Sequence, residues 1–198
     1  DCLLSRGLGD VYKRQLEALA NASVDDVLAV WRGLGYYGRA RRIHEAAQKV
    51  MTDPHLRGQL PANAQELMEH IPGVGPYTAG AISSIVFGHA VPILDGNVAR
   101  VLCRQTGLYS DPRAKSTNDL LWHMARMLVE SVAPHERSDV PGRWNQGLME
   151  LGSTLCTPTR PGCDTCPIKP TCLTYAEGRM YEGDLAQSEE KDICLLYT

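Results

Sequence analysis

Apolar residues recur along most of this chain at intervals of three and four, which is the spacing of a helix with one buried face. The first regular segment follows Ser23, a residue type that caps helix N-termini, and it carries Asp26 three positions later. No stretch shows a convincing alternation of apolar and polar residues, so the pattern predicts an all-α fold. Further helices are expected to begin near Arg39, Asn63, Pro76, Asp95, Ser116 and Trp144.

Three of these expectations can be stated more closely. In the helix from Arg39, Ile43 and Ala47 mark the face expected to be buried, and the arginines lie on the other face. The helix from Pro76 is expected to continue to about Phe87. The segment 133–141, with two prolines and mixed charge, is the expected flexible connection.

The composition is that of a globular chain with 198 residues, of which 43% are hydrophobic. No apolar run approaches the roughly 18 residues that a membrane-spanning helix needs, so we expect no membrane partner. Seven cysteines without a secretory signal favour a reducing compartment and a metal site. The expected location is therefore the cytoplasm of a bacterium, or the nucleus or mitochondrion of a eukaryote.

The net charge of −3 is unusual for a nucleic-acid binder, but the charges are unevenly distributed. Between Trp31 and Val50 five basic residues stand against one acidic residue, whereas from Tyr175 to Asp192 six acidic residues stand against two basic ones. A local basic face matters more for contact with phosphates than the total charge does.

A glycine hairpin, Ile71 to Pro76, connects two predicted helices. Its glycines allow a tight turn, after which the free N–H groups at the start of the helix from Pro76 can face an anion such as a DNA phosphate. An ordinary helix–helix turn would use the same glycines. The spacing of a hydrophobic residue and Gly73, Val74 and Gly75 resembles the helix-hairpin-helix element of DNA repair proteins, which favours DNA binding.

Asp95 precedes the predicted helix that contains Asn97, and the commoner role of an aspartate at that place is a helix cap. A fixed carboxylate can also stabilise the positive charge that develops on deoxyribose when an N-glycosidic bond breaks. The two roles can be held together by different oxygens.

Position 77 limits the chemistry. A lysine there would offer an amine able to form a Schiff base with the sugar, followed by strand cleavage. Tyr77 cannot form that adduct, so its presence favours base removal alone. The simpler alternative is a tyrosine packed at a helix start with its hydroxyl satisfied.

Tyr36 and Tyr37 stand between two glycines, just ahead of the arginine-rich helix that begins at Arg39. An aromatic residue in this position can wedge between bases while arginines hold phosphates. The alternative is a core tyrosine beside a solvated charged face. We expect one tyrosine of each kind.

Four cysteines follow the last predicted helix with the spacing Cys-x6-Cys-x2-Cys-x5-Cys: Cys156, Cys163, Cys166 and Cys172. Four thiolates in one short loop can enclose a metal centre, and their spacing alone leaves an iron–sulfur cluster and tetrahedral zinc equally open. A disulfide is less favoured. Cys103 is expected to be a small core residue.

Taken together, the segments 34–41, 72–81 and 93–98 and the four cysteines resemble adenine DNA glycosylases of the MutY type, from about Leu16 to Cys172. The resemblance implies removal of adenine paired with 8-oxoguanine or guanine, after the base has been flipped out of the duplex. It implies that Asp95 supports the cationic sugar, that Asn97 hydrogen-bonds in the same site, and that Tyr77 lies beside the flipped base. It makes Tyr36 the wedge and the cysteines the ligands of a 4Fe-4S cluster.

The resemblance also implies an architecture, a helical barrel bearing the hairpin followed by an iron–sulfur helical domain. We assign residues 16–93 to the barrel, 94–173 to the iron–sulfur domain and 174–198 to an acidic, disordered tail. Residues 1–15 receive no role and are treated as possible foreign sequence. The expected partner is double-stranded DNA containing the mismatch, bound by a monomer.

Two departures from the family pattern lead us to expect a catalytic-core fragment that is weakly active or inactive. The family's general-acid glutamate lies upstream of residue 16 before a Gln-Gln-Thr motif, and neither residues 1–15 nor Glu17 matches that context. The family's C-terminal Nudix-like domain has no counterpart after Cys172. Two alternatives stay open: a bifunctional glycosylase and lyase of the endonuclease III type acting on oxidised pyrimidines, and a non-enzymatic iron–sulfur DNA-binding module.

Overall fold

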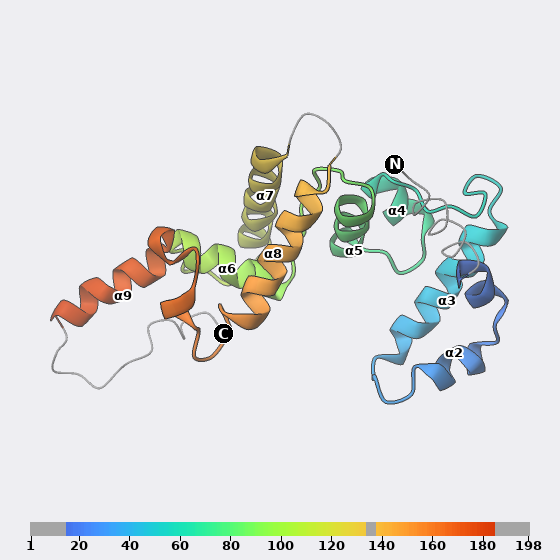
Figure 1. The fold of residues 1–198 in the computed structure, drawn as a ribbon, viewed down its shortest axis with the longest axis horizontal. Coiled ribbons are helices and arrows are strands. Elements are labelled where there is room, and N and C mark those ends of the chain that lie inside the picture. The colour runs from blue at the N-terminus through green and yellow to red at the C-terminus, as the bar shows by residue number, and fades with distance from the viewer. Residues whose placement is uncertain (1–14, 134–137, 185–198) are drawn as a thin grey trace. The chain divides into compact units, whose positions relative to one another are not determined.

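A computed structural model describes residues 15–133 and 138–184, with side chains up to Gly178. Within these ranges every regular element is a helix, which confirms the all-α prediction (Figure 1). Contacts between residues divide the chain into two compact units, Asp1–Ala79 and Gly80–Thr198. Among the described residues, no helix has both the length and the apolar character needed to cross a membrane.

The first unit contains a helical stretch at residues 15–21 followed by α2 (Val24–Val30), α3 (Tyr37–Thr52) and α4 (Ala64–His70). The predicted cap at Ser23 is confirmed, because Ser23 Oγ accepts the Asp26 N–H at 3.1 Å. The helix expected near Asn63 is also present, and Asn63 Oδ1 caps it by accepting the Gln65 N–H at 2.8 Å. Each cap satisfies a backbone donor that the first turn of its helix leaves unpaired.

The buried face of α3 differs from the prediction. Ile43 is 46% exposed, whereas His44 is 3% exposed and its Nε2 lies 3.0 Å from the Ala22 carbonyl oxygen. Ala47 is buried as predicted, but Ala40 and His44 take the place of Ile43 on the face that packs inward. A buried histidine becomes acceptable there because a backbone carbonyl pairs with its ring nitrogen.

Helix α5 (Pro76–Ala81) continues as a π-helix, η1 (Ile82–Val86), so the predicted helix from Pro76 is confirmed but its last turn is wider than expected. The widened turn lies against a helix of the second unit, α8 (Val140–Thr154). There, Asn145 donates to Ser84 Oγ at 2.8 Å, and both side chains are buried. The π-turn therefore coincides with a place where a polar side chain inserts against the helix.

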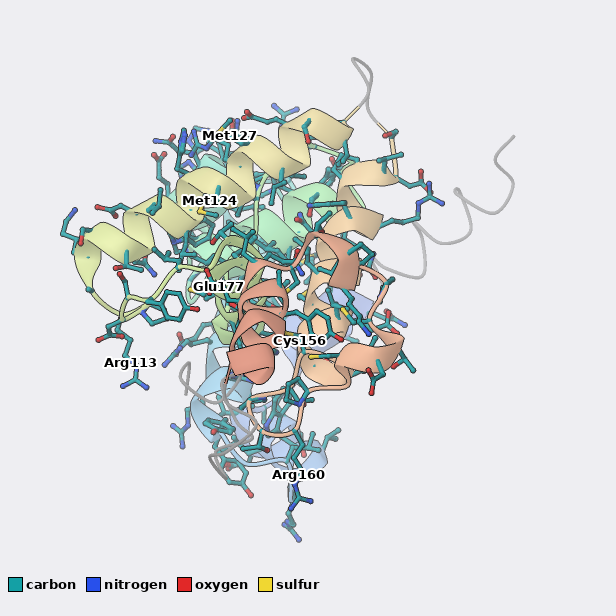
Figure 2. All side chains as sticks on the ribbon, turned by 90° about the vertical axis from the view of Figure 1, so that its left-hand side faces the viewer. Arg113, Met124, Met127, Cys156, Arg160 and Glu177 are labelled. Atoms are coloured by element: carbon teal, nitrogen blue, oxygen red, sulfur yellow. The ribbon has the colours of Figure 1, made fainter. Side chains whose placement is uncertain are left out.

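The core of the second unit is formed by α6 (Gly96–Thr106), α7 (Lys115–Val132) and α8, which pack against one another. Figure 2 shows Met124 and Met127 on α7, and Met127 is 58% exposed. Cys103 is fully buried, as predicted, and this burial raises the pKa of its thiol. The buried cluster consists of Ile93, Leu94, Val98, Ala99, Leu102, Cys103, Leu121 and Ala125.

The C-terminal part differs from the expected disordered tail beginning at residue 174. The segment 155–172, which holds the four cysteines and is called the cysteine loop below, contains two 3₁₀ turns, η2 (Cys163–Thr165) and η3 (Lys169–Thr171). It leads directly into α9 (Leu173–Asp184), which packs against α6. Thr174 is 1% exposed, because α9 lies on the core rather than in solvent. Residues 185–198, residues 1–14 and residues 134–137 of the expected flexible connection lie outside the described residues.

The division between the units also falls earlier than the boundary we expected after residue 93. A Cβ at Gly80 would overlap the Pro92 carbonyl oxygen, so the segment that leads to Asp95 packs against the end of α5. Residues 80–93 consequently belong with α6 and α8.

Two glycines of α8 provide a test of this packing. A Cβ at Gly142 would lie 2.8 Å from the Ser84 carbonyl oxygen and from the Ile85 Cα, whereas a Cβ at Gly147 would meet nothing within 4 Å. We predict that Gly142→Ala lowers the free energy of unfolding by about 1–3 kcal/mol through overpacking. Gly147→Ala, the matched control, should raise it by up to about 1 kcal/mol through helix propensity. Urea unfolding measures both, and equal effects would contradict the close approach.

Candidate functional site

The hairpin turns at Gly73, whose φ of +76° lies in the left-handed region that favours glycine. Val74 N–H donates to the Ile71 carbonyl at 3.3 Å and closes the turn, and Ala79 N–H donates to the Gly75 carbonyl at 2.9 Å and begins α5. A Cβ at Gly75 would meet nothing within 4 Å, so only the first glycine is required by the turn itself.

Arg42 lies directly beneath the hairpin. A Cβ at Gly73 would lie 2.7 Å from Arg42 Cδ and 2.8 Å from Arg42 Cβ, so the apolar stem of the arginine fills the space under the turn. The residue after the turn, Val74, is half-buried. The structure thus brings the basic helix α3 and the hairpin together within the first unit.

Tyr36 precedes α3 in a left-handed conformation, with φ of 48°, and is 78% exposed. The Arg39 guanidinium lies 4.9 Å from the centre of its ring, which is a cation–π distance. Tyr37 is 46% exposed, so the expectation that one of the two tyrosines is buried is wrong for the described structure. Both rings are available to solvent beside the arginines.

Tyr77 lies in the first turn of α5 and is 38% exposed. It belongs to the first unit together with the hairpin, whereas Asp95, Asn97 and the four cysteines belong to the second.

Asp95 is the N-cap of α6, as predicted. Its Oδ1 accepts the Val98 N–H at 2.8 Å, and its Oδ2 accepts the Asn97 Nδ2 at the longer distance of 3.3 Å. The carboxylate is partly buried beside the buried residues Ile93 and Leu94. One oxygen therefore performs the capping, and the other is held less tightly by Asn97.

Arg100, one turn along α6, extends this arrangement toward the cysteine loop. Its guanidinium donates to Asn97 Oδ1 at 2.8 Å, to the Gly152 carbonyl at 2.6 Å and to the Cys156 carbonyl at 2.8 Å. Burial lowers the pKa of Arg100, and the nearby Cys156 and Asp95 oppose that shift. A hydrogen-bonded path therefore joins the first cysteine to the Asp95 carboxylate.

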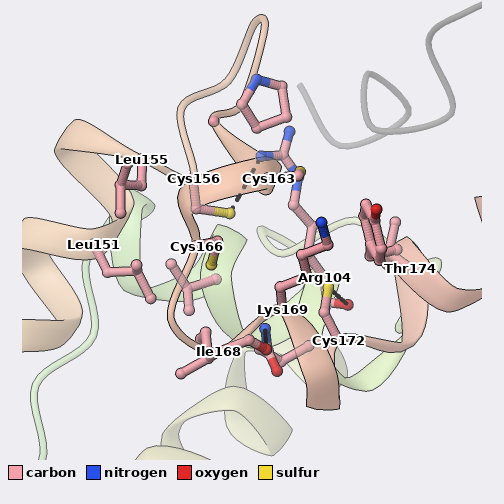
Figure 3. A pocket seen from close by; sticks show the side chains of 15 residues that line it. Arg104, Leu151, Leu155, Cys156, Cys163, Cys166, Ile168, Lys169, Cys172 and Thr174 are labelled. Carbon is pink, nitrogen blue, oxygen red and sulfur yellow. Dashed lines mark hydrogen bonds between the residues drawn. The ribbon is translucent and has the colours of Figure 1, made fainter.

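All four cysteines line one pocket between α6, the cysteine loop and the start of α9 (Figure 3). The space between these residues, counted together with its opening to solvent, measures about 440 Å³. Arg160, in the same loop, has φ of 52° and points away from the protein (Figure 2). The irregular backbone between the first two cysteines thus turns the thiols inward and the basic side chain outward.

The chemistry of the pocket suits an anionic sulfur centre. Arg104 is 2% exposed, and its guanidinium contacts Cys156 Sγ at 3.3 Å and donates to the Thr157 carbonyl at 2.8 Å. Thr174 Oγ1 lines the same space, is buried and lacks a hydrogen-bond partner among the described residues. Burial raises the pKa of the Cys172 thiol, and the other three cysteines raise it further. Thiolates here need a compensating cation.

Within residues 15–133 and 138–184, no group of three or more His, Cys, Asp or Glu side chains is close enough to hold a single metal ion.

Three functional side chains were missed from the sequence: Arg100, Arg104 and Asn145. Arginines four residues apart on an otherwise apolar helix face were an available signal, because a buried charge needs a partner. Asn145, which is 2% exposed, offered no comparable signal.

Comparisons with known proteins place this geometry in a family. Residues 6–127 match the family described as "HhH-GPD superfamily base excision DNA repair protein". The match begins within the stretch 1–15, to which the sequence alone assigns no role.

Among related proteins, the adenine DNA glycosylase of Homo sapiens is 43% identical over 183 residues, covering 90% of this chain and 32% of that protein. The Schizosaccharomyces pombe enzyme of the same name is 38% identical over 184 residues, covering 90% and 37%. The chain spans about a third of the length of the first mammalian relatives it matches.

A solved thermostable thymine-DNA glycosylase superposes with a TM-score of 0.66 at 26% identity, over 82% of this chain and 70% of that one. A non-covalent endonuclease III–DNA complex shares the fold with a TM-score of 0.62 at 23% identity, over 84% and 71%. Because the family match spans more than half of the sequence, the chain belongs to the HhH-GPD superfamily of base excision DNA repair proteins.

Proposed function

We propose that this chain is the core of an adenine DNA glycosylase, an enzyme that hydrolyses the N-glycosidic bond of adenine in duplex DNA. The observation that carries the proposal is the Asp95 carboxylate, held by two hydrogen bonds at the start of α6. The surrounding chain is 43% identical to the human enzyme of that name over 183 residues.

Asp95 is suited to stabilise the sugar cation. As the bond to adenine lengthens, positive charge develops on the deoxyribose, and a negative group that is already oriented lowers the barrier without reorganising. The two hydrogen bonds to the carboxylate supply that orientation. Asn97 is placed to hold the second oxygen.

The first unit supplies the DNA contacts in this proposal. The hairpin Gly73 to Gly75 and the arginines of α3 would hold phosphates, and Tyr36, exposed on its strained turn, would insert between bases. The substrate we propose is a duplex with adenine opposite 8-oxoguanine or guanine. Tyr77 would lie near the flipped adenine, where it offers a phenol in place of an amine.

We further propose that Cys156, Cys163, Cys166 and Cys172 hold a 4Fe-4S cluster. The thiols line a common pocket whose walls include the buried Arg104 cation and the unpartnered Thr174 hydroxyl. One zinc ion would draw the four sulfurs to within roughly 4 Å of one another, given Zn–S bonds of about 2.3 Å. A 4Fe-4S cluster binds each cysteine through a different iron and therefore needs the four sulfurs farther apart. Bound there, it would cross-link the loop.

Substituting Asp95 separates catalysis from capping. We predict that Asp95→Asn lowers the single-turnover rate of adenine excision by about 10²- to 10³-fold, because the charge is lost from the reacting centre. The melting temperature should change little, because asparagine caps helices about as well as aspartate. The assay uses duplexes with adenine opposite 8-oxoguanine.

Both this chain and the full-length product of its gene should be measured, because the resemblance places the general acid upstream of residue 16. If Asp95→Asn excises adenine at an unchanged rate, Asp95 is only a helix cap and has no catalytic role. Release of thymine glycol in place of adenine would assign the protein to the endonuclease III type.

The presence of Tyr77 predicts base removal without strand cleavage. After excision, the DNA strand should stay intact until hot alkali is added, because no amine occupies this position to form a Schiff base. Denaturing electrophoresis with and without the alkali step measures the difference. Cleavage that keeps pace with base release in the untreated sample would contradict the assignment.

Metal analysis tests the cysteine centre. Protein purified without oxygen should contain about four iron and four sulfide per chain. Cys166→Ala should lose most of the iron and lower the melting temperature, because the cross-link of the loop is lost. Cys103→Ala is the matched control, because Cys103 is buried in the core outside the pocket, and its iron content should be unchanged. Stoichiometric zinc in a colourless protein would overturn the proposal.

A further inference from the structure

One face of α8 lies against the backbone of neighbouring elements at both ends of the helix. Gly142, Asn145 and Gly152 follow one another at intervals of three and seven residues, so they lie on the same side of the helix. A Cβ at Gly142 would lie 2.8 Å from the Ser84 carbonyl oxygen, and one at Gly152 would lie 2.8 Å from the Asn97 carbonyl oxygen. The two glycines therefore bring α8 close to η1 at one end and to the first turn of α6 at the other.

Asn145 lies between these two approaches and is 2% exposed. Its Nδ2 donates one hydrogen bond to Ser84 Oγ at 2.8 Å and a second to the Val91 carbonyl at 2.9 Å. An amide nitrogen carries two protons, so both are used. The side chain thus ties α8 to the π-helix and to the irregular segment that leads to Asp95.

The segment from Val91 to Leu94 depends on such a contact. This segment is neither helix nor strand, so no regular backbone hydrogen bonds fix its path. Its residues Pro92, Ile93 and Leu94 are buried. The carbonyl of Val91, a partly buried residue, accepts its hydrogen bond from the buried side chain of Asn145. Only three residues lie between Val91, whose carbonyl is anchored, and Asp95.

The downstream side of Asp95 is held by the same helix. The Gly152 carbonyl accepts from Arg100 at 2.6 Å, and Arg100 donates to Asn97 Oδ1 at 2.8 Å. Asn97 in turn donates to Asp95 Oδ2 at 3.3 Å. Asp95 is therefore placed between two points of contact with α8, Val91 before it and Asn97 after it.

We propose that Asn145 is a positioning residue for Asp95, acting through the Val91 carbonyl to fix the segment that carries the catalytic carboxylate. The proposal rests on the proposed function for its catalytic consequence. Because misplacing a reacting group by about 1 Å can cost about a hundredfold in rate, loss of this anchor should slow excision far more than it weakens DNA binding.

Two substitutions isolate the contact. Asn145→Asp keeps the shape and removes the amide donor, and Asn145→Ala removes the side chain without adding a charge. Either should lower the single-turnover rate of adenine excision by about 10- to 100-fold at saturating duplex. Affinity for a duplex whose adenosine cannot be cleaved should be unchanged. Ser84→Ala is the matched control: it removes one partner of Asn145, leaves the bond to Val91, and should excise at the wild-type rate.

Hydrogen exchange provides a second test that does not depend on adenine excision. The Val98 amide donates to Asp95 Oδ1, so its hydrogen exchange reports the position of the carboxylate. Exchange at Val98 should accelerate by about tenfold in both Asn145 variants and stay unchanged in Ser84→Ala. If the Asn145 variants do not fold, slow exchange of the Asn145 Nδ2 protons in the unaltered protein tests the same two bonds.

The outcomes separate the two proposals. If the unaltered full-length protein does not excise adenine, the proposed function is wrong. The role of Asn145 is then decided by the hydrogen exchange of Val98 alone. Equal losses of rate in Ser84→Ala and the Asn145 variants, Val98 exchange that does not respond, or rapid exchange of the Asn145 Nδ2 protons would overturn the positioning role.

Discussion

The second unit depends on how closely α8 approaches the backbone of its neighbours. Gly142 lies against η1 and Gly152 lies against the first turn of α6, and a Cβ at either place would force backbone to move. Protein interiors are packed as densely as organic crystals, so such contacts have little slack. With both ends of α8 in place, the connection between η1 and α6 can follow only a restricted path, and Asp95 stands at the end of that path.

Polar side chains replace regular hydrogen bonding along this path and in the cysteine loop. Neither segment has regular backbone hydrogen bonding, and side chains bind carbonyls in both of them. Asn145 serves Val91, Arg100 serves Gly152 and Cys156, and Arg104 serves Thr157 and Pro158. Two arginines of α6 consequently bind the helix that begins with Asp95 to the loop that carries the cysteines.

The buried arginines also account for the charge of the pocket. An isolated buried cation would be strongly unfavourable, but Arg104 is paired with carbonyls and with the sulfur of Cys156. Burial and the other three cysteines raise the pKa of the Cys172 thiol. In the proposed 4Fe-4S centre, positively charged iron would offset the negative charge of the bound thiolates.

Local signals were sufficient to predict several features from the sequence. The caps Ser23 and Asp95 were predicted because a capping bond closes within three residues, and the absence of an amine at Tyr77 is a matter of residue type alone. Only the tertiary structure decided that His44 is buried in place of Ile43, that the helix from Pro76 ends in a π-turn, and that α9 follows the cysteines. It alone revealed Asn145, Arg100 and Arg104. Their partners lie more than fifty residues away, and no local pattern records which distant carbonyl a buried donor will meet.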